Sequence, residues 1–197
     1  MFRGPCRSLS MRATFCAIGF IVCIASGVGQ TKTPASVTIL FKFESAHSQI
    51  AVQEMKRELG TLMEPMGFEL AWRDRGDIAT ADAFDDLVLV DFRGRCSMLA
   101  ADVPGQRNGA LAHTAVSDGK VLPFSEVECD RVRGFLHSAK GGAEGRQPDL
   151  ALGRALARVL AHELHHVLTQ STAHADSGLA KSSLSRAELV SQSLEFK

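Results

Sequence analysis

The chain has 197 residues, and its 22 lysines and arginines are balanced by 22 aspartates and glutamates. No basic run and no cluster of aromatic residues is present, so the composition argues against a nucleic-acid-binding protein. Tyrosine is absent and Trp72 is the single tryptophan, which argues against an aromatic sugar-binding platform. The expectation that remains is an ordinary globular domain.

The N-terminus has the composition of a secretory signal peptide. Three arginines and no acidic residue precede a short apolar run at residues 13–22, and small residues follow at 25–27. The apolar run is shorter than the roughly 20 residues that a membrane span requires. We therefore predict that residues 1–27 are a cleaved signal, that the protein is exported (periplasmic or secreted), and that no stable membrane span remains. An uncleaved anchor is the alternative.

Residues 28–197 are predicted to form a single domain. Loss of the three signal arginines leaves 19 basic residues against 22 acidic ones, in a segment of about 170 residues that is long enough for one hydrophobic core. Cys96 and Cys129 are the cysteines that this segment keeps. Two cysteines in an oxidising compartment favour a disulfide bond over two buried thiols. We expect the domain to be a monomer.

The first half of the domain alternates between strand and helix patterns. Residues 37–43 are rich in β-formers and predict a strand. Apolar residues then recur at helical spacing from about Ser48 and stop in the region 60–65. Residues 68–73 alternate as a half-buried strand does. Residues 87–92 are an apolar run interrupted by Asp91 alone, which is typical of an interior strand. The β-α-β order predicts a parallel pair of strands with a right-handed crossover.

Three further segments are predicted before the last third of the chain. Residues 74–86 are acidic and irregular, which favours a solvated loop. Residues 110–116 are predicted to return as an edge strand. A short helix is expected to begin near Glu126 and to run to His137.

A long helix is predicted from Pro148 to Leu168. Apolar residues recur there at steps of three and four, several alanines favour helix, and a proline is tolerated in a first turn. Gly153 is either a weak point of this helix or a place where another element packs closely. Near the C-terminus, Ser185 and Glu188 match a capping box before an apolar residue, which predicts a final helix.

The long helix carries the sequence His162-Glu163-Leu164-His165-His166. Residues four apart lie on the same helix face with Cβ atoms about 5–6 Å apart, so His162 and His166 can converge on one zinc ion. Glu163 then lies beside the metal, where it can deprotonate a water molecule. His165 points about 100° away around the helix and is not expected to join them. The alternative is a helix with solvent-facing histidines, against which the apolar stripe argues.

A catalytic zinc site usually has three protein ligands, so a third ligand is needed. His174 follows His166 by eight residues, beyond the polar stretch 169–172 that predicts the helix end. It is ranked first. Glu188 is ranked second, because a capping role already accounts for it, and Asp176, in the turn just past His174, is ranked third.

These residues resemble the pattern H-E-x-x-H-x-x-G-x-x-H, followed by a methionine-containing turn, of the metzincin-like zinc metallopeptidases. Residues 162–166 match it, and His174 arrives two residues later than the third histidine of the pattern. Thr169 stands where the family has its glycine, and Leu179 where a turn methionine is expected. The resemblance implies a zincin-like α+β fold: a small mixed twisted sheet with packed helices, an α/β-type N-terminal part, and the active-site helix near the C-terminus.

In such folds an edge strand lies along the cleft and pairs with an extended substrate. The resemblance thus makes one segment the candidate for backbone recognition by strand addition. An ordinary hairpin arm is the alternative, and the histidine in this segment is interpreted as a surface or core residue rather than a ligand. The candidate substrate-binding residues are Gly109, Ala110, Leu111, Ala112 and His113.

The function expected from these observations is that of an exported zinc metallopeptidase with Glu163 as the general base and a peptide or protein as substrate. Two alternatives stay open. One is another zinc amidohydrolase, similar to the peptide deformylases, in which Cys129 would be an upstream ligand. The other is a non-catalytic binding module stabilised by zinc with four protein ligands.

Overall fold

The computed structural model describes most of the domain that follows the predicted signal peptide, which itself lies outside the described residues. In the described part, no helix combines the length and the apolar character that crossing a membrane requires. The described residues are 34–79, 82–84, 86–99, 109–137 and 147–196.

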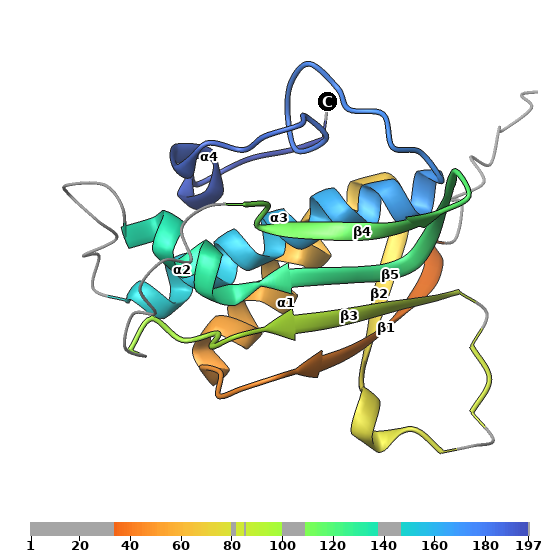
Figure 1. Cartoon of the computed structure of the whole chain (residues 1–197), viewed down its shortest axis with the longest axis horizontal. Coiled ribbons are helices and arrows are strands. Elements are labelled where there is room, and N and C mark those ends of the chain that lie inside the picture. Colours follow the sequence, from red (N-terminus) through yellow and green to blue (C-terminus); the bar gives the residue numbers. More distant parts are fainter. Residues whose placement is uncertain (1–33, 80–81, 85, 100–108, 138–146, 197) are drawn as a thin grey trace, which may run out of the picture. The chain divides into compact units, whose positions relative to one another are not determined.

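Five strands form one mixed sheet in the order β2-β1-β3-β5-β4 (Figure 1). The neighbours β2-β1, β1-β3 and β3-β5 pair in parallel, and β4 pairs antiparallel with β5 at the sheet edge. The α+β class, the mixed sheet and the parallel pairing of the first two strands are confirmed. The strands are β1 (Ala35–Phe43), β2 (Phe68–Asp74), β3 (Leu87–Arg93), β4 (Ala112–Ser117) and β5 (Lys120–Glu128).

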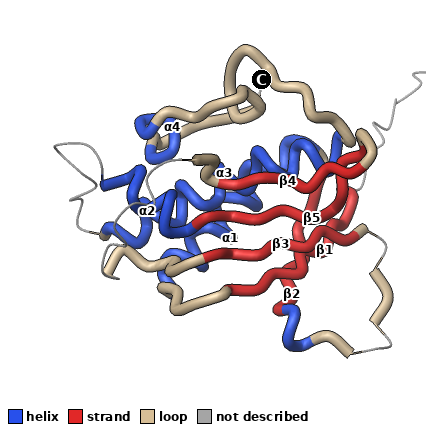
Figure 2. Tube along the Cα trace, in the orientation of Figure 1, coloured by secondary structure: helices blue, strands red, loops and turns tan. Residues whose placement is uncertain are grey.

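Helices α1 and α3 lie side by side against one face of the sheet (Figure 2). They pack closely at Gly153, where an added Cβ atom would meet the backbone oxygen of Ala51 and the side chain of Glu54. Of the two interpretations of this glycine, close packing is therefore correct. The helices are α1 (Gln49–Met63), α2 (Cys129–His137), α3 (Pro148–Thr169) and α4 (Arg186–Val190), with 3-10 turns η1 (Glu64–Met66) and η2 (Arg75–Asp77).

The predicted starts of α1 and α4 are confirmed by their caps. Ser48 accepts a hydrogen bond from the backbone N–H of Ala51 at the start of α1. At the start of α4, Ser185 accepts from the backbone of Glu188, whose carboxylate accepts from the backbone of Ser185 in return. Both caps satisfy N–H groups that a helix end leaves without partners.

The prediction for residues 126–137 was wrong at its start. Strand β5 was not predicted, and it includes Glu126, Val127 and Glu128, which pair with the end of β3. Helix α2 therefore begins at Cys129. The predicted loop at 74–86 also contains the short turn η2, where Arg75 forms an ion pair of 2.8 Å with Asp91 on β3.

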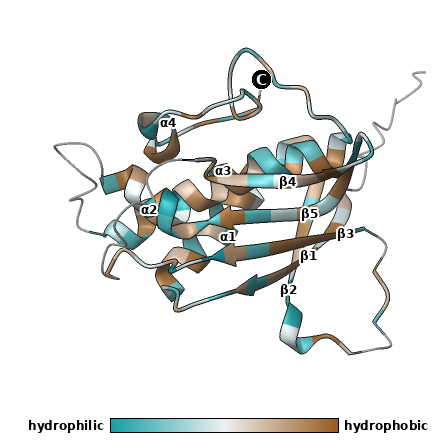
Figure 3. Ribbon diagram, in the orientation of Figure 1, coloured by the Kyte–Doolittle hydropathy of each residue, from teal (hydrophilic) through white to brown (hydrophobic). Residues whose placement is uncertain are grey.

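The core lies between the sheet and the two long helices. Strand β3 is largely brown in the hydropathy colouring of Figure 3, and Val88, Val90 and Phe92 on it are buried. Cys96 and Cys129 are also buried and form the predicted disulfide, with Cα atoms 5.0 Å apart. The disulfide ties the segment after β3 to the first turn of α2.

Candidate metal centre

Helix α3 positions the central residues of the site because its apolar face is buried along its whole length. Leu152, Leu156, Leu160 and Leu164 have no exposed surface. The helix ends at Gln170, whose left-handed backbone (φ 51°) reverses the chain after the last turn. This reversal returns the following segment toward the helix.

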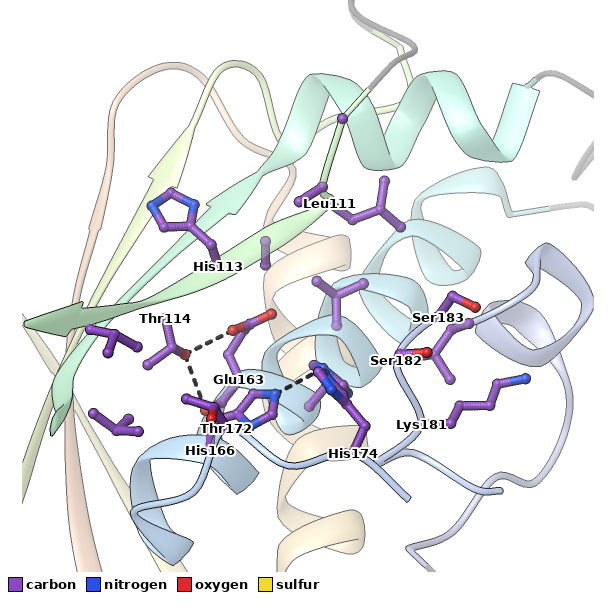
Figure 4. A pocket seen from close by; sticks show the side chains of 18 of the residues that line it. Leu111, His113, Thr114, Glu163, His166, Thr172, His174, Lys181, Ser182 and Ser183 are labelled. Atoms are coloured by element: carbon purple, nitrogen blue, oxygen red, sulfur yellow. Dashed lines mark hydrogen bonds between the residues drawn. The ribbon is translucent and has the colours of Figure 1, made fainter. Parts of the chain in front are cut away.

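The returning segment brings His174 to the pair on α3 (Figure 4). One ring nitrogen from each of His162, His166 and His174 lies within 4.8 Å of the others, and within the described part of the chain no other group of histidines, cysteines and carboxylates meets this condition. The ring of His174 stacks on that of His162 with centroids 5.2 Å apart, and its centroid is 4.8 Å from that of His166. This group could hold a metal ion.

The hydrogen bonds of His162 and His166 determine which nitrogen is free to bind a metal. Nδ1 of His162 lies 2.8 Å from the carbonyl oxygen of Leu179, and Nδ1 of His166 lies 2.7 Å from that of Ser171. A carbonyl oxygen only accepts, so each Nδ1 carries the proton and each neutral ring has a lone pair on Nε2. Metal-binding histidines are held in this way by a second partner.

The two Nε2 atoms lie 3.1 Å apart. When both rings are neutral and protonated on Nδ1, no proton is left to form a hydrogen bond between the two Nε2 atoms, and their lone pairs face each other. A cation between them resolves that repulsion. Two nitrogens bound to a tetrahedral zinc at about 2.0–2.1 Å are separated by roughly 3.3–3.4 Å, so the spacing of this pair suits a metal ion of that size.

Burial keeps His162 in the form that binds metal. It lowers the pKa of His162 below the usual histidine value, and the hydrogen bond to Leu179 only partly opposes this. A neutral imidazole is the form that ligates zinc. Leu179 itself is fully buried, so the turn that follows His174 is anchored in the core beneath the histidine pair.

Glu163 lies beside the histidines and is largely buried, with 7% of its surface exposed. Its Oε2 atom accepts a hydrogen bond of 2.8 Å from the hydroxyl of Thr114 on β4. Burial raises the pKa of Glu163 above the usual glutamate value, while the bond from Thr114 opposes the increase. A raised pKa suits a carboxylate that must accept a proton near neutral pH.

A cavity of about 510 Å³ opens over this group. Its volume falls within the range of about 300–1,000 Å³ that is usual for ligand sites. One wall is the edge strand β4 with the residues before it, and the five predicted substrate-binding residues, 109–113, all line it. The opposite wall is the segment 181–184, which was not predicted as part of the site.

The alternative ligands lie elsewhere. The carboxylate of Glu188 contacts Lys181 Nζ at 2.6 and 2.7 Å, and this contact together with Ser185 lowers the pKa of Glu188 to about 2. Asp176 and Glu188 line a separate hollow. His165 points away from the group and stacks on Phe196 with centroids 5.5 Å apart.

The hydrogen bond from Thr114 to Glu163 was not predicted from the sequence. Thr114 lies in the predicted edge strand, directly after His113, but its bond to Glu163 joins residues 49 positions apart in the chain. The alternation of a strand could have indicated it, because Thr114 faces the same side as Ala112.

Comparisons of the chain with known protein families, with curated proteins and with solved structures give no match. The assignment of function therefore depends on the geometry of the site.

Proposed function

We propose that the protein is an exported zinc-dependent metallopeptidase of the zincin type. One observation carries the proposal: three imidazoles converge at the floor of a cavity, the Nε2 atoms of two of them lie 3.1 Å apart, and a buried carboxylate stands beside them. Three histidines leave the fourth position of a tetrahedral zinc open, which is the arrangement of catalytic zinc sites.

The residues have distinct roles in peptide hydrolysis. His162, His166 and His174 would hold the zinc ion, which supplies a Lewis acid that polarises a peptide carbonyl and makes water a better nucleophile. Glu163 accepts the proton of the attacking water and passes it to the leaving amine.

The substrate is proposed to be an extended peptide. Strand β4 is at the sheet edge and lines the cavity, so its free backbone groups can pair with a peptide as an added strand. Apolar side chains from several elements form part of the cavity lining, which favours an apolar substrate side chain. They are Leu111, Phe135, Val159 and Leu184.

Export is supported by two features. The arginine-flanked apolar run at the start of the chain is typical of a secretory signal. The disulfide between Cys96 and Cys129 is a bond that persists in oxidising compartments. The same disulfide argues against the deformylase-like alternative, because it engages the cysteine that would have been a metal ligand.

The proposal is tested by hydrolysis of casein with the mature protein. We expect the purified protein to contain zinc, to lose activity on chelation and to regain it when zinc is added. Glu163→Gln should keep the zinc and lower the rate by at least about 10²-fold, because the general base is gone. His165→Gln is the matched control on the same helix and should stay active.

Two results would contradict the proposal. One is a wild-type protein that holds no zinc after purification and after dialysis against zinc. The other is a Glu163→Gln variant that cleaves casein at the wild-type rate.

A further inference from the structure

Two hydroxyl groups interrupt the apolar inner face of the β4–β5 hairpin. Ala112 pairs with Val127 across the two strands, and both side chains are buried. Two residues along the strand, Thr114 pairs with Ser125, and it therefore points to the same side of the sheet. Ser125 has no exposed surface. A buried hydroxyl is costly unless it is hydrogen-bonded, so Ser125 needs a partner on this face, and the half-buried Thr114 lies opposite it.

The two hydroxyls form a chain of hydrogen bonds that ends at Glu163. The oxygens of Thr114 and Ser125 are 3.0 Å apart. Thr114 Oγ1 lies 2.8 Å from Oε2 of Glu163 and 3.3 Å from the backbone carbonyl oxygen of the same residue (Figure 4). These contacts join the edge strand directly to α3 at the position of the carboxylate.

The direction of donation along these hydrogen bonds follows from the carboxylate that accepts the last of them. An ionised carboxylate only accepts hydrogen bonds, and a hydroxyl has a single proton to donate. Thr114 therefore donates to Glu163, and it accepts from Ser125. The register of β4 against β5 shifts just beyond this pair, between Thr114 and Val116, and such irregularities are common next to active sites.

We propose that Thr114 and Ser125 are positioning residues that hold Oε2 of Glu163 in place and leave Oε1 as the oxygen that accepts a proton from water. The proposal rests on the proposed function, because it takes Glu163 as the base. A displacement of about 1 Å in a reacting group costs about 10²-fold in rate. A glutamate has several rotatable bonds, and a bond to one of its oxygens removes much of that freedom.

The position of Thr114 on β4 also relates the base to the bound substrate. Thr114 lies on β4, the strand proposed to pair with the peptide, so one residue links the substrate-binding strand to the base. A peptide that pairs with β4 is thereby placed in register with Glu163. Ser125 acts one step further away, through the hydroxyl of Thr114.

The first experiment compares three variants of the mature, zinc-loaded protein. Thr114→Val removes the hydroxyl and keeps the shape, Thr114→Ser keeps the hydroxyl, and Thr38→Val on β1 is a matched control in the same sheet. We expect Thr114→Val to lower kcat by about 10- to 100-fold with KM and zinc content unchanged, and Thr114→Ser to stay within about threefold of wild type. Thr38→Val should leave all three quantities unchanged.

Two results of that experiment would overturn the proposal. If Thr114→Val keeps the wild-type kcat, the hydroxyl does not position the base. If Thr114→Ser is as impaired as Thr114→Val, the loss comes from packing rather than from the hydrogen bond.

The second experiment uses the metal-free protein and needs no activity. Urea unfolding of wild type, Thr114→Val, Glu163→Ala and the double variant forms a double-mutant cycle. We expect the effects of the two single changes not to add, because each removes the same hydrogen bond. Additive effects would contradict the contact. If the wild type binds no zinc or cleaves no peptide, the proposed function fails, and this cycle still decides whether Thr114 holds Glu163.

Discussion

Helix α3 carries two polar clusters, and they differ in how their hydrogen bonds are satisfied. In the middle of the helix, Arg158 is fully buried, and it donates to Glu58 at 2.8 and 3.0 Å and to the backbone of Ser191 at 2.8 Å. Near the end of the helix, His162 and His166 each have one nitrogen bound to a carbonyl, and their other nitrogens face each other.

This difference in hydrogen bonding distinguishes the arginine cluster, which we interpret as structural, from the histidine cluster, which we interpret as a binding site. The arginine cluster is closed, because the protein itself supplies the acceptors around the guanidinium. Through Arg158, the cluster connects Ser191 in the C-terminal segment with Glu58 on α1. The histidine cluster is open toward a cavity, and within the described part of the chain the Nε2 atoms of His162 and His166 are hydrogen-bonded to nothing but each other. The polar groups buried on α3 are thus explained in two ways: the arginine by its contacts within the protein, and the histidines by the site proposed for a metal.

The variant His166→Ala tests this comparison with the largest expected change in zinc binding and activity. Removal of one of three zinc ligands should abolish zinc binding at micromolar metal and lower hydrolysis by at least about 10³-fold. Added zinc should raise the melting temperature of the wild type, because it binds the folded state, and should not raise that of the variant. A variant that keeps a full complement of zinc would show that the histidine is not a ligand.

The arginine cluster predicts a change in stability instead. Arg158→Met leaves the carboxylate of Glu58 buried without its main partner, which costs about 3–5 kcal/mol of unfolding free energy. Arg73→Met is the matched control, because Arg73 is an exposed arginine on β2, and its loss should cost no more than about 0.5 kcal/mol. Urea unfolding measures both. Equal losses in the two variants would contradict the structural role of the buried arginine.

Apart from the control variants, the smallest change in stability is expected when Glu188 is substituted. Its pKa is lowered to about 2 by Lys181 and Ser185, so its contribution to stability is present above pH 4.5 and is lost as the pH falls toward 2. Glu188→Gln should therefore be less stable than wild type at pH 7, by no more than about 1 kcal/mol, and the difference should vanish near pH 2. Zinc content should not change. Loss of zinc in this variant would instead favour Glu188 as the third ligand.

Local patterns in the sequence predict the part of the site that one helix carries. The spacing of His162 and His166 on an apolar helix predicts their convergence, because the period of the helix fixes it. The caps at Ser48 and Ser185 are predictable for the same reason, since each is satisfied within one turn.

Contacts between distant segments were predicted less well. Strand β5 was missed, because Pro123 and Ser125 interrupt the alternation of apolar residues in it. The bond between Thr114 and Glu163 depends on how that hairpin packs on α3. The alternation of β4 indicates the side that Thr114 faces, but it does not name the residue that Thr114 meets there. The pairing of Cys96 with Cys129 was predictable only because residues 28–197 contain two cysteines.

The central claim is that three imidazoles bind one zinc ion and leave a position open. X-ray absorption spectroscopy of the zinc-loaded protein tests it most directly. The account predicts three histidine nitrogens and one oxygen at about 2.0–2.1 Å from the metal, with no sulfur near 2.3 Å. A site with four protein ligands, or with a cysteine sulfur among them, would contradict it.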